Sequence, residues 1–71
     1  MTPAEFIRKD VLGFRTQAEL AEILGTTQPT VCRWERKGRF PPAVQLQIRD
    51  LAKGKPWNDA WFFEVPDEAG A

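Results

Sequence analysis

The chain has 71 residues and no formal net charge, with 42% hydrophobic and 28% charged residues, which is typical of one small globular domain rather than a disordered segment. It has no histidine and a single cysteine, Cys32, which excludes a zinc site and an internal disulfide and removes the commonest general base. We therefore expect no enzyme, no cofactor and no metal. Because no apolar stretch could cross a bilayer and no signal pattern opens the chain, we expect a cytoplasmic protein with no membrane or small-molecule partner.

Two capping patterns predict helices in the first part of the chain. Thr2 with Glu5 can begin a first helix, which Gly13 ends. Its apolar stripe consists of Phe6, Ile7, Val11 and Leu12. Thr16 with Glu19 repeats the pattern and predicts a second helix that runs to about Leu24. Its predicted buried face consists of Leu20, Ala21, Ile23 and Leu24.

A third helix is predicted only three residues after Leu24. Thr27 can cap it, and Pro29 falls in its first turn, where a missing N–H costs little. Val31 and Trp34 lie on one side of this helix, and Gly38 ends it. Trp34 is therefore interpreted as a core residue rather than a platform for stacking on bases.

The last part of the chain predicts a fourth helix, an aromatic segment and a tail. Pro41-Pro42 begins the fourth helix, and Gly54 and Pro56 close it. Its apolar positions are Val44, Leu46, Ile48, Leu51 and Ala52. Asn58 or Asp59 could cap a last short helix, although Phe62–Val65 could equally form a short strand. We assign residues 1–66 to one helical domain and residues 67–71 to a flexible acidic tail.

The segment from Gln17 to Arg36 has the pattern of a helix-turn-helix, two short helices joined by a tight turn that contains glycine. Ala21 is small where the two helices cross, and Gly25 can adopt the left-handed conformation that the turn needs. The spacing of the apolar residues leaves a polar and basic face on the second motif helix. This face consists of Gln28, Pro29, Cys32, Arg33 and Arg36.

Basic residues are concentrated on this helix and just after it. Residues 28–55 carry seven basic and two acidic side chains, a balance of +5, whereas residues 56–71 carry four acidic side chains and no basic one. A local basic face, rather than the net charge, meets the phosphates of a nucleic acid. On the fourth helix and after it, Arg49, Lys53 and Lys55 are either phosphate clamps or charges that serve solubility only.

The segment Gln17–Gly38 resembles the helix-turn-helix of the Cro and lambda-repressor-like proteins. The matching features are Gln17, Ala21, Gly25, Gln28, Val31 and the string Trp34-Glu35-Arg36. The continuation through Pro41-Pro42 into LQIRDLAKGK looks like the short phage-type and antitoxin-like members of that group. The resemblance implies a compact all-α domain of four to five helices, with or without a short C-terminal extended segment.

The resemblance also implies a site, in which the helix from Gln28 to Lys37 enters the major groove of double-stranded DNA. The residues expected to read bases are Gln28, Pro29, Cys32 and Arg33. The residues expected to contact phosphates are Gln17, Thr27, Arg36, Lys37 and Arg39. Pro29 and Cys32 depart from the polar residues usual at their positions, which changes the base code but not the docking. Cys32 is either an ordinary groove-facing residue or a redox-sensitive thiol.

Two functions fit these patterns. The first is a sequence-specific transcription regulator, a Cro-like repressor that binds a pseudo-palindromic site as a homodimer. The residues expected at the dimer interface are Trp57, Trp61, Phe62 and Phe63, which would otherwise form an exposed apolar patch. The second is an antitoxin-like module whose acidic, aromatic C-terminus binds a partner protein.

Overall fold

Two of the helices begin directly after the capping residues that the sequence predicts. The computed structural model describes residues 1–66, and in it α2 (Gln17–Leu24) begins after Thr16. The Thr16 hydroxyl accepts a hydrogen bond from the Glu19 N–H, and the Glu19 carboxylate accepts one from the Thr16 N–H, so the predicted capping box is confirmed. α3 (Gln28–Lys37) begins after Thr27, whose hydroxyl accepts from the Thr30 N–H.

The first predicted helix has two parts. α1 (Pro3–Phe6) is α-helical, and the chain then widens into the π-helical turn η1 (Ile7–Val11). The wider turn is visible in the Leu12 N–H, which donates to the Ile7 carbonyl at 2.9 Å, five residues back instead of four. The pattern of caps and apolar residues contains no signal for this change of pitch.

Two further helices follow α3 within residues 1–66. α4 (Pro42–Leu51) follows Pro41, and the 3₁₀ helix η2 (Asp59–Phe62) is capped by the side chain of Asn58. Of the two predicted caps for the last element, Asn58 is therefore correct. Residues 1–66 contain no strand, so the domain is all-α and the alternative of an extended segment over Phe62–Val65 is wrong.

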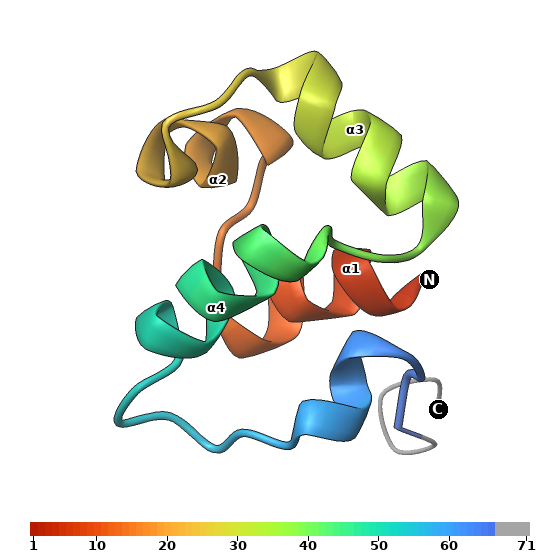
Figure 1. Cartoon of the computed structure of the whole chain (residues 1–71), viewed down its shortest axis with the longest axis vertical. Helices are drawn as coiled ribbons and strands as arrows, with labels where there is room; N and C mark the ends of the chain where they lie inside the picture. The colour runs from red at the N-terminus through yellow and green to blue at the C-terminus, as the bar shows by residue number, and fades with distance from the viewer. Residues whose placement is uncertain (67–71) are drawn as a thin grey trace.

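The helices are arranged in tiers (Figure 1). α2 and α3 pack against each other at one end, α1 and α4 occupy the middle, and η2 covers the opposite end. The overall extents are 30 × 25 × 22 Å. The core between the tiers contains Ala4, Phe6, Ile7, Leu12, Leu20, Ala21, Val31, Phe40, Ile48, Ala52 and Phe62. Trp34 is partly buried against this core, as predicted, and its ring meets Phe40 edge to face at 6.0 Å.

Ile23, which was predicted to be buried, and Leu46, one of the predicted apolar positions of the fourth helix, are exposed. Ile23 on α2 is 54% exposed and Leu46 on α4 is 67% exposed. The prediction was wrong because each helix is covered on one side only in a domain this small, so the buried stripe is narrower than the apolar stripe of the sequence.

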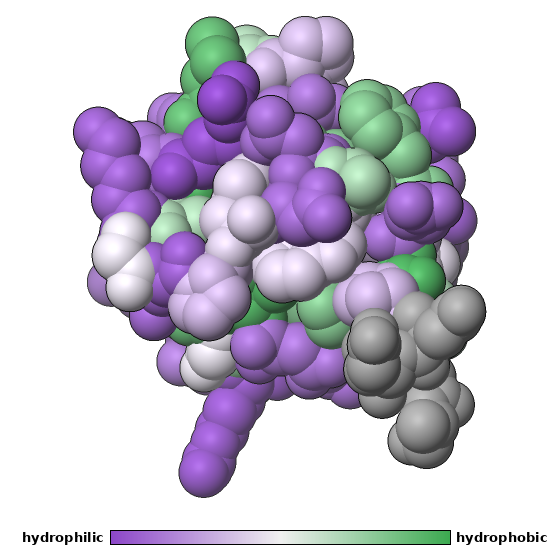
Figure 2. Space-filling view, turned by 90° about the horizontal axis from the view of Figure 1, so that it is seen from below, coloured by the Kyte–Doolittle hydropathy of each residue, from purple (hydrophilic) through white to green (hydrophobic). Residues whose placement is uncertain are grey.

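The C-terminal aromatic residues are largely folded back onto the domain. Phe62 is 4% exposed, Trp61 meets Phe6 edge to face at 5.4 Å, and Trp57 meets Phe62 at 5.0 Å. Phe63, by contrast, is 56% exposed. Seen from the η2 side, the surface is a mosaic in which hydrophilic side chains separate small apolar areas (Figure 2). Of the four aromatic residues expected at a dimer interface, Phe62 is therefore buried within one copy, Trp57 and Trp61 are partly buried, and Phe63 keeps the largest exposed fraction.

Within residues 1–66, no helix combines the length and the apolar character needed to cross a membrane. The predicted acidic tail, residues 67–71, lies outside the described residues.

Candidate nucleic-acid interface

The turn between α2 and α3 has the geometry of a helix-turn-helix. Gly25 ends α2 with φ +72°, the left-handed conformation that favours glycine, and the Thr26 N–H donates to the Ala21 carbonyl at 2.9 Å. Ala21 and Val31, from the two helices, are 3% and 0% exposed. A small residue at the crossing and a left-handed glycine in the turn thus hold α3 across α2, which leaves the other side of α3 at the surface.

The outward side of α3 gathers all four residues predicted to read bases. Gln28, Pro29, Cys32 and Arg33 line one shallow hollow of about 320 Å³ together with Arg36. A second hollow of about 240 Å³ adjoins it, because Cys32 and Arg36 line both. Gln17 of α2 and Thr2 of the N-terminus also line the second hollow. The two motif helices therefore present one continuous polar surface.

The basic side chains of α3 are exposed without an acidic partner among the described residues, whereas Arg49, the basic residue of α4, has one. Arg33, Arg36 and Lys37 are exposed and take part in none of the salt bridges within residues 1–66. This availability matches the prediction that α3 carries the contacts to phosphates and bases, which itself stays a prediction.

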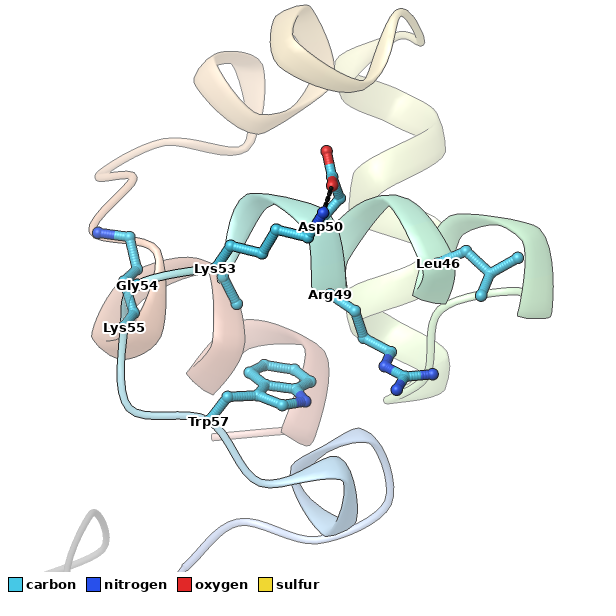
Figure 3. Close-up of a pocket in the computed structure, with 8 residues that line it drawn as sticks. Leu46, Arg49, Asp50, Lys53, Gly54, Lys55 and Trp57 are labelled. Carbon is cyan, nitrogen blue, oxygen red and sulfur yellow. Dashed lines mark ion pairs between the residues drawn. The ribbon is translucent and has the colours of Figure 1, made fainter.

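On and after α4, two of the three basic side chains, those of Arg49 and Lys53, have acidic partners. Arg49 lies 3.4 Å from Asp59, and Lys53 lies 2.9 Å from Asp50, whose hydrogen bond and negative charge raise the pKa of Lys53. Arg49, Asp50 and Lys53 line an open hollow of about 510 Å³, together with Trp57 (Figure 3). The pairing favours the interpretation of Arg49 and Lys53 as surface charge rather than phosphate clamps, whereas Lys55 takes part in none of the salt bridges within residues 1–66.

Two of the residues predicted to meet phosphates have contacts of their own. The guanidinium of Arg39 lies 5.3 Å from the centre of the Phe63 ring, in a cation–π arrangement toward the C-terminal segment. The Thr27 hydroxyl is engaged at the start of α3, where it lies 2.9 Å from the Thr30 hydroxyl. Gln17 also has side-chain hydrogen bonds, which are described below. Arg36 and Lys37 form no side-chain hydrogen bond, salt bridge or cation–π contact within residues 1–66 and suit the role better.

A buried ion pair lies directly beneath this surface. The Arg8 Nε donates to Glu35 Oε2 at 2.6 Å, and the two side chains are 5% and 6% exposed. Arg8 also donates to the carbonyls of Phe14 and Arg15 at 3.1 and 2.7 Å, so its guanidinium fastens η1 to the loop before α2. The sequence analysis missed this pair. Glu35 follows Val31 by one helical turn, and that spacing was the signal for its burial.

The ion pair continues outward into both glutamines of the predicted site. Gln17 Nε2 donates to Glu35 Oε1 at 3.1 Å, and Gln28 Nε2 donates to Gln17 Oε1 at 2.6 Å. A chain of four side chains therefore runs from the core, through α2, to the start of α3. The sequence predicted separate roles for Gln17 and Gln28, whereas the structure joins them.

Comparisons of the chain with protein-family models, with curated proteins and with solved structures find no match.

Proposed function

We propose that this protein is a sequence-specific DNA-binding regulator of transcription of the Cro-like repressor kind, with α3 as the helix that enters the major groove. The observation that carries the proposal is the outward side of α3, where an amide and two guanidinium groups, of Gln28, Arg33 and Arg36, line one hollow. Amide and guanidinium groups make the bidentate contacts that distinguish adenine and guanine in the major groove.

The electrostatic setting supports the same proposal. α3 ends in Arg36 and Lys37, and neither side chain forms a salt bridge within residues 1–66. Basic groups without acidic partners attract phosphates and release the counterions condensed on DNA. On this proposal Gln28 and Arg33 read base edges, while Gln17, Arg36 and Lys37 hold the backbone.

The regulator acts as a homodimer in this proposal, because one recognition helix spans only a few base pairs. Two copies then place their α3 helices about one turn of DNA, roughly 34 Å, apart on a pseudo-palindromic site. Trp57, Trp61 and Phe62 are partly or fully buried within one copy, so Phe63 is the member of the expected interface with most surface to offer.

The test compares two basic residues of α3. Arg33→Ala should weaken binding by about 1–3 kcal/mol and relax the preference at one base pair, because the side chain reads a base. Lys37→Ala should weaken binding to all sequences alike and reduce the salt dependence, because the side chain meets phosphate. Selection of binding sites from a random duplex library, followed by titrations at several salt concentrations, measures both effects.

The matched control is Lys55→Ala, which removes a basic side chain from the loop after α4. Its effect on site preference should be nil. Failure of the unmodified protein to bind any duplex at low salt would overturn the proposed function.

A further inference from the structure

The backbone of Arg39 belongs to the end of α3, whereas its side chain lies against the C-terminal segment. Gly38 ends α3 with φ +86°, and the Arg39 N–H donates to the Trp34 carbonyl at 3.2 Å, which completes the turn at the helix end. The guanidinium carbon lies over the Phe63 ring, 5.3 Å from its centre. The Arg39 side chain is exposed and takes part in none of the salt bridges within residues 1–66.

The Phe63 ring is held in place by the fold although it is 56% exposed. The Phe63 N–H donates to the Ala60 carbonyl at 2.9 Å, which completes the last turn of η2. The preceding Phe62 is 4% exposed, and the two rings meet edge to face with their centres 6.5 Å apart. An aromatic ring fixed in this way can keep a cation in one place relative to the rest of the domain.

A cation–π contact differs from a salt bridge in the groups that it leaves free. A carboxylate occupies the N–H donors of its partner, as Asp59 does with Arg49 Nε at 3.4 Å. An aromatic ring attracts the guanidinium through its quadrupole and supplies no oxygen acceptor, so the planar fork of N–H donors still needs one. The contact with Phe63 therefore orders Arg39 and leaves it able to bind a phosphate in bidentate fashion.

We propose that Phe63 is a positioning residue that holds the Arg39 guanidinium in place for a phosphate of the DNA backbone. This inference rests on the proposed function and adds to it a contact from the loop between α3 and α4. A freely moving arginine side chain loses rotamer freedom when it binds, whereas one that is already stacked has lost part of that freedom beforehand. Because ordering one flexible side chain weakens binding by about two- to tenfold, Phe63 should strengthen DNA binding by a factor of that size for each copy bound.

The experiment measures binding of the whole chain to duplex DNA at several salt concentrations. Phe63→Leu keeps an apolar side chain and removes the aromatic face. It should weaken binding to every sequence by about two- to tenfold for each copy bound, with an unchanged salt dependence, because Arg39 still meets its phosphate. Arg39→Ala should reduce the slope of log affinity against log salt by about one for each copy. Phe63→Trp, which retains an aromatic face, should bind as tightly as the unmodified protein.

Phe63 is also the most exposed residue of the expected dimer interface, so a double-mutant cycle is needed to separate the two uses of the ring. If the ring acts through Arg39, Phe63→Leu should have no effect in a protein that already carries Arg39→Ala. In a protein that carries Lys37→Ala, the matched change of a neighbouring basic residue, Phe63→Leu should keep its full effect. An equal effect in both backgrounds would overturn the proposal, and so would an unchanged affinity of the Phe63→Leu variant alone.

A measurement without DNA separates this inference from the proposed function. NMR relaxation reports order parameters for the Nε–H bonds of arginine side chains. In the free protein the order parameter of Arg39 should exceed those of Arg33 and Arg36, and in Phe63→Leu it should fall to their level. If it does not exceed theirs, the inference fails whether or not DNA binds. If the order parameters behave as expected and no duplex binds, the proposed function fails together with the phosphate contact, while the ordering of Arg39 by Phe63 is confirmed.

Discussion

Replacement of Arg8 by methionine should destabilise the domain severely. Methionine fills much of the space but leaves the Glu35 carboxylate, now 6% exposed, without its charged partner. The loss of one partner from a buried ion pair costs about 3–5 kcal/mol. The carbonyls of Phe14 and Arg15, which also lose a donor, lie in a more exposed loop where water can replace it.

This cost is large relative to the stability available. A domain of this size has a free energy of unfolding of roughly 4–10 kcal/mol, so Arg8→Met should remove about a third of it or more. The melting temperature should fall by roughly 4–8 °C for each kcal/mol lost. Urea denaturation followed by tryptophan fluorescence measures the free energy, with Trp34, Trp57 and Trp61 as the reporters.

The double variant Arg8→Met with Glu35→Leu separates the two contributions to this cost. Because it removes both charges, it should recover most of the stability that the single variant loses. A cost below about 1 kcal/mol for Arg8→Met would refute the reasoning, since an unpaired carboxylate cannot be buried so cheaply. A double variant as unstable as the single one would show that the packing of the arginine stem, rather than its charge, matters.

Three further changes test other parts of the structure. Gly25→Ala should lower the free energy of unfolding by about 1–2 kcal/mol through backbone strain alone, because φ is +72° and an added Cβ meets no atom within 4 Å. Thermal denaturation should detect this loss, and an unchanged melting temperature would argue against a left-handed turn. Thr16→Ala should cost about 1 kcal/mol in the same assay through loss of the α2 cap, and a neutral result would mean that the capping box adds no stability. Phe63→Ser should weaken the proposed dimer in sedimentation without unfolding the monomer. Ile23→Ser, which changes a similarly exposed residue on α2, should leave the dimer intact. Equal effects of the two variants would reject the interface.

The elements that the sequence predicted well are those with local causes. Thr16, Thr27 and Asn58 cap the helices that follow them, and Gly25 and Gly38 end α2 and α3, because each signal acts within one turn of the chain. The outward side of α3 was predictable for the same reason. Once Val31 is placed inside, the helical period decides which neighbours face out.

The features that the sequence did not predict depend on distant partners. The spacing from Val31 places Glu35 on the buried side of α3, but it does not show that the partner is Arg8, 27 residues earlier in the chain. Ile23 and Leu46 are exposed because no other helix covers them, which no local pattern records. Phe62 belongs to the core because η2 returns to α1, so an aromatic cluster that suggested a dimer surface is mostly internal. In each case the tertiary arrangement, rather than the local sequence pattern, determines whether the side chain is buried and which partner it contacts.

The C-terminal end of α3 lies beside the N-terminal residues of the chain, which affects where a fusion partner can be attached. A Cβ placed on Gly38 would lie 3.7 Å from Thr2 and 3.8 Å from Pro3, and Thr2 also borders the hollow that Gln17 and Arg36 line. An affinity tag or fluorescent protein fused ahead of Met1 would therefore emerge beside the surface proposed to approach DNA. A basic tag there would add nonspecific phosphate contacts, and a bulky one would obstruct the groove. Binding assays with N-terminal fusions should consequently be repeated after the fusion partner has been cleaved off.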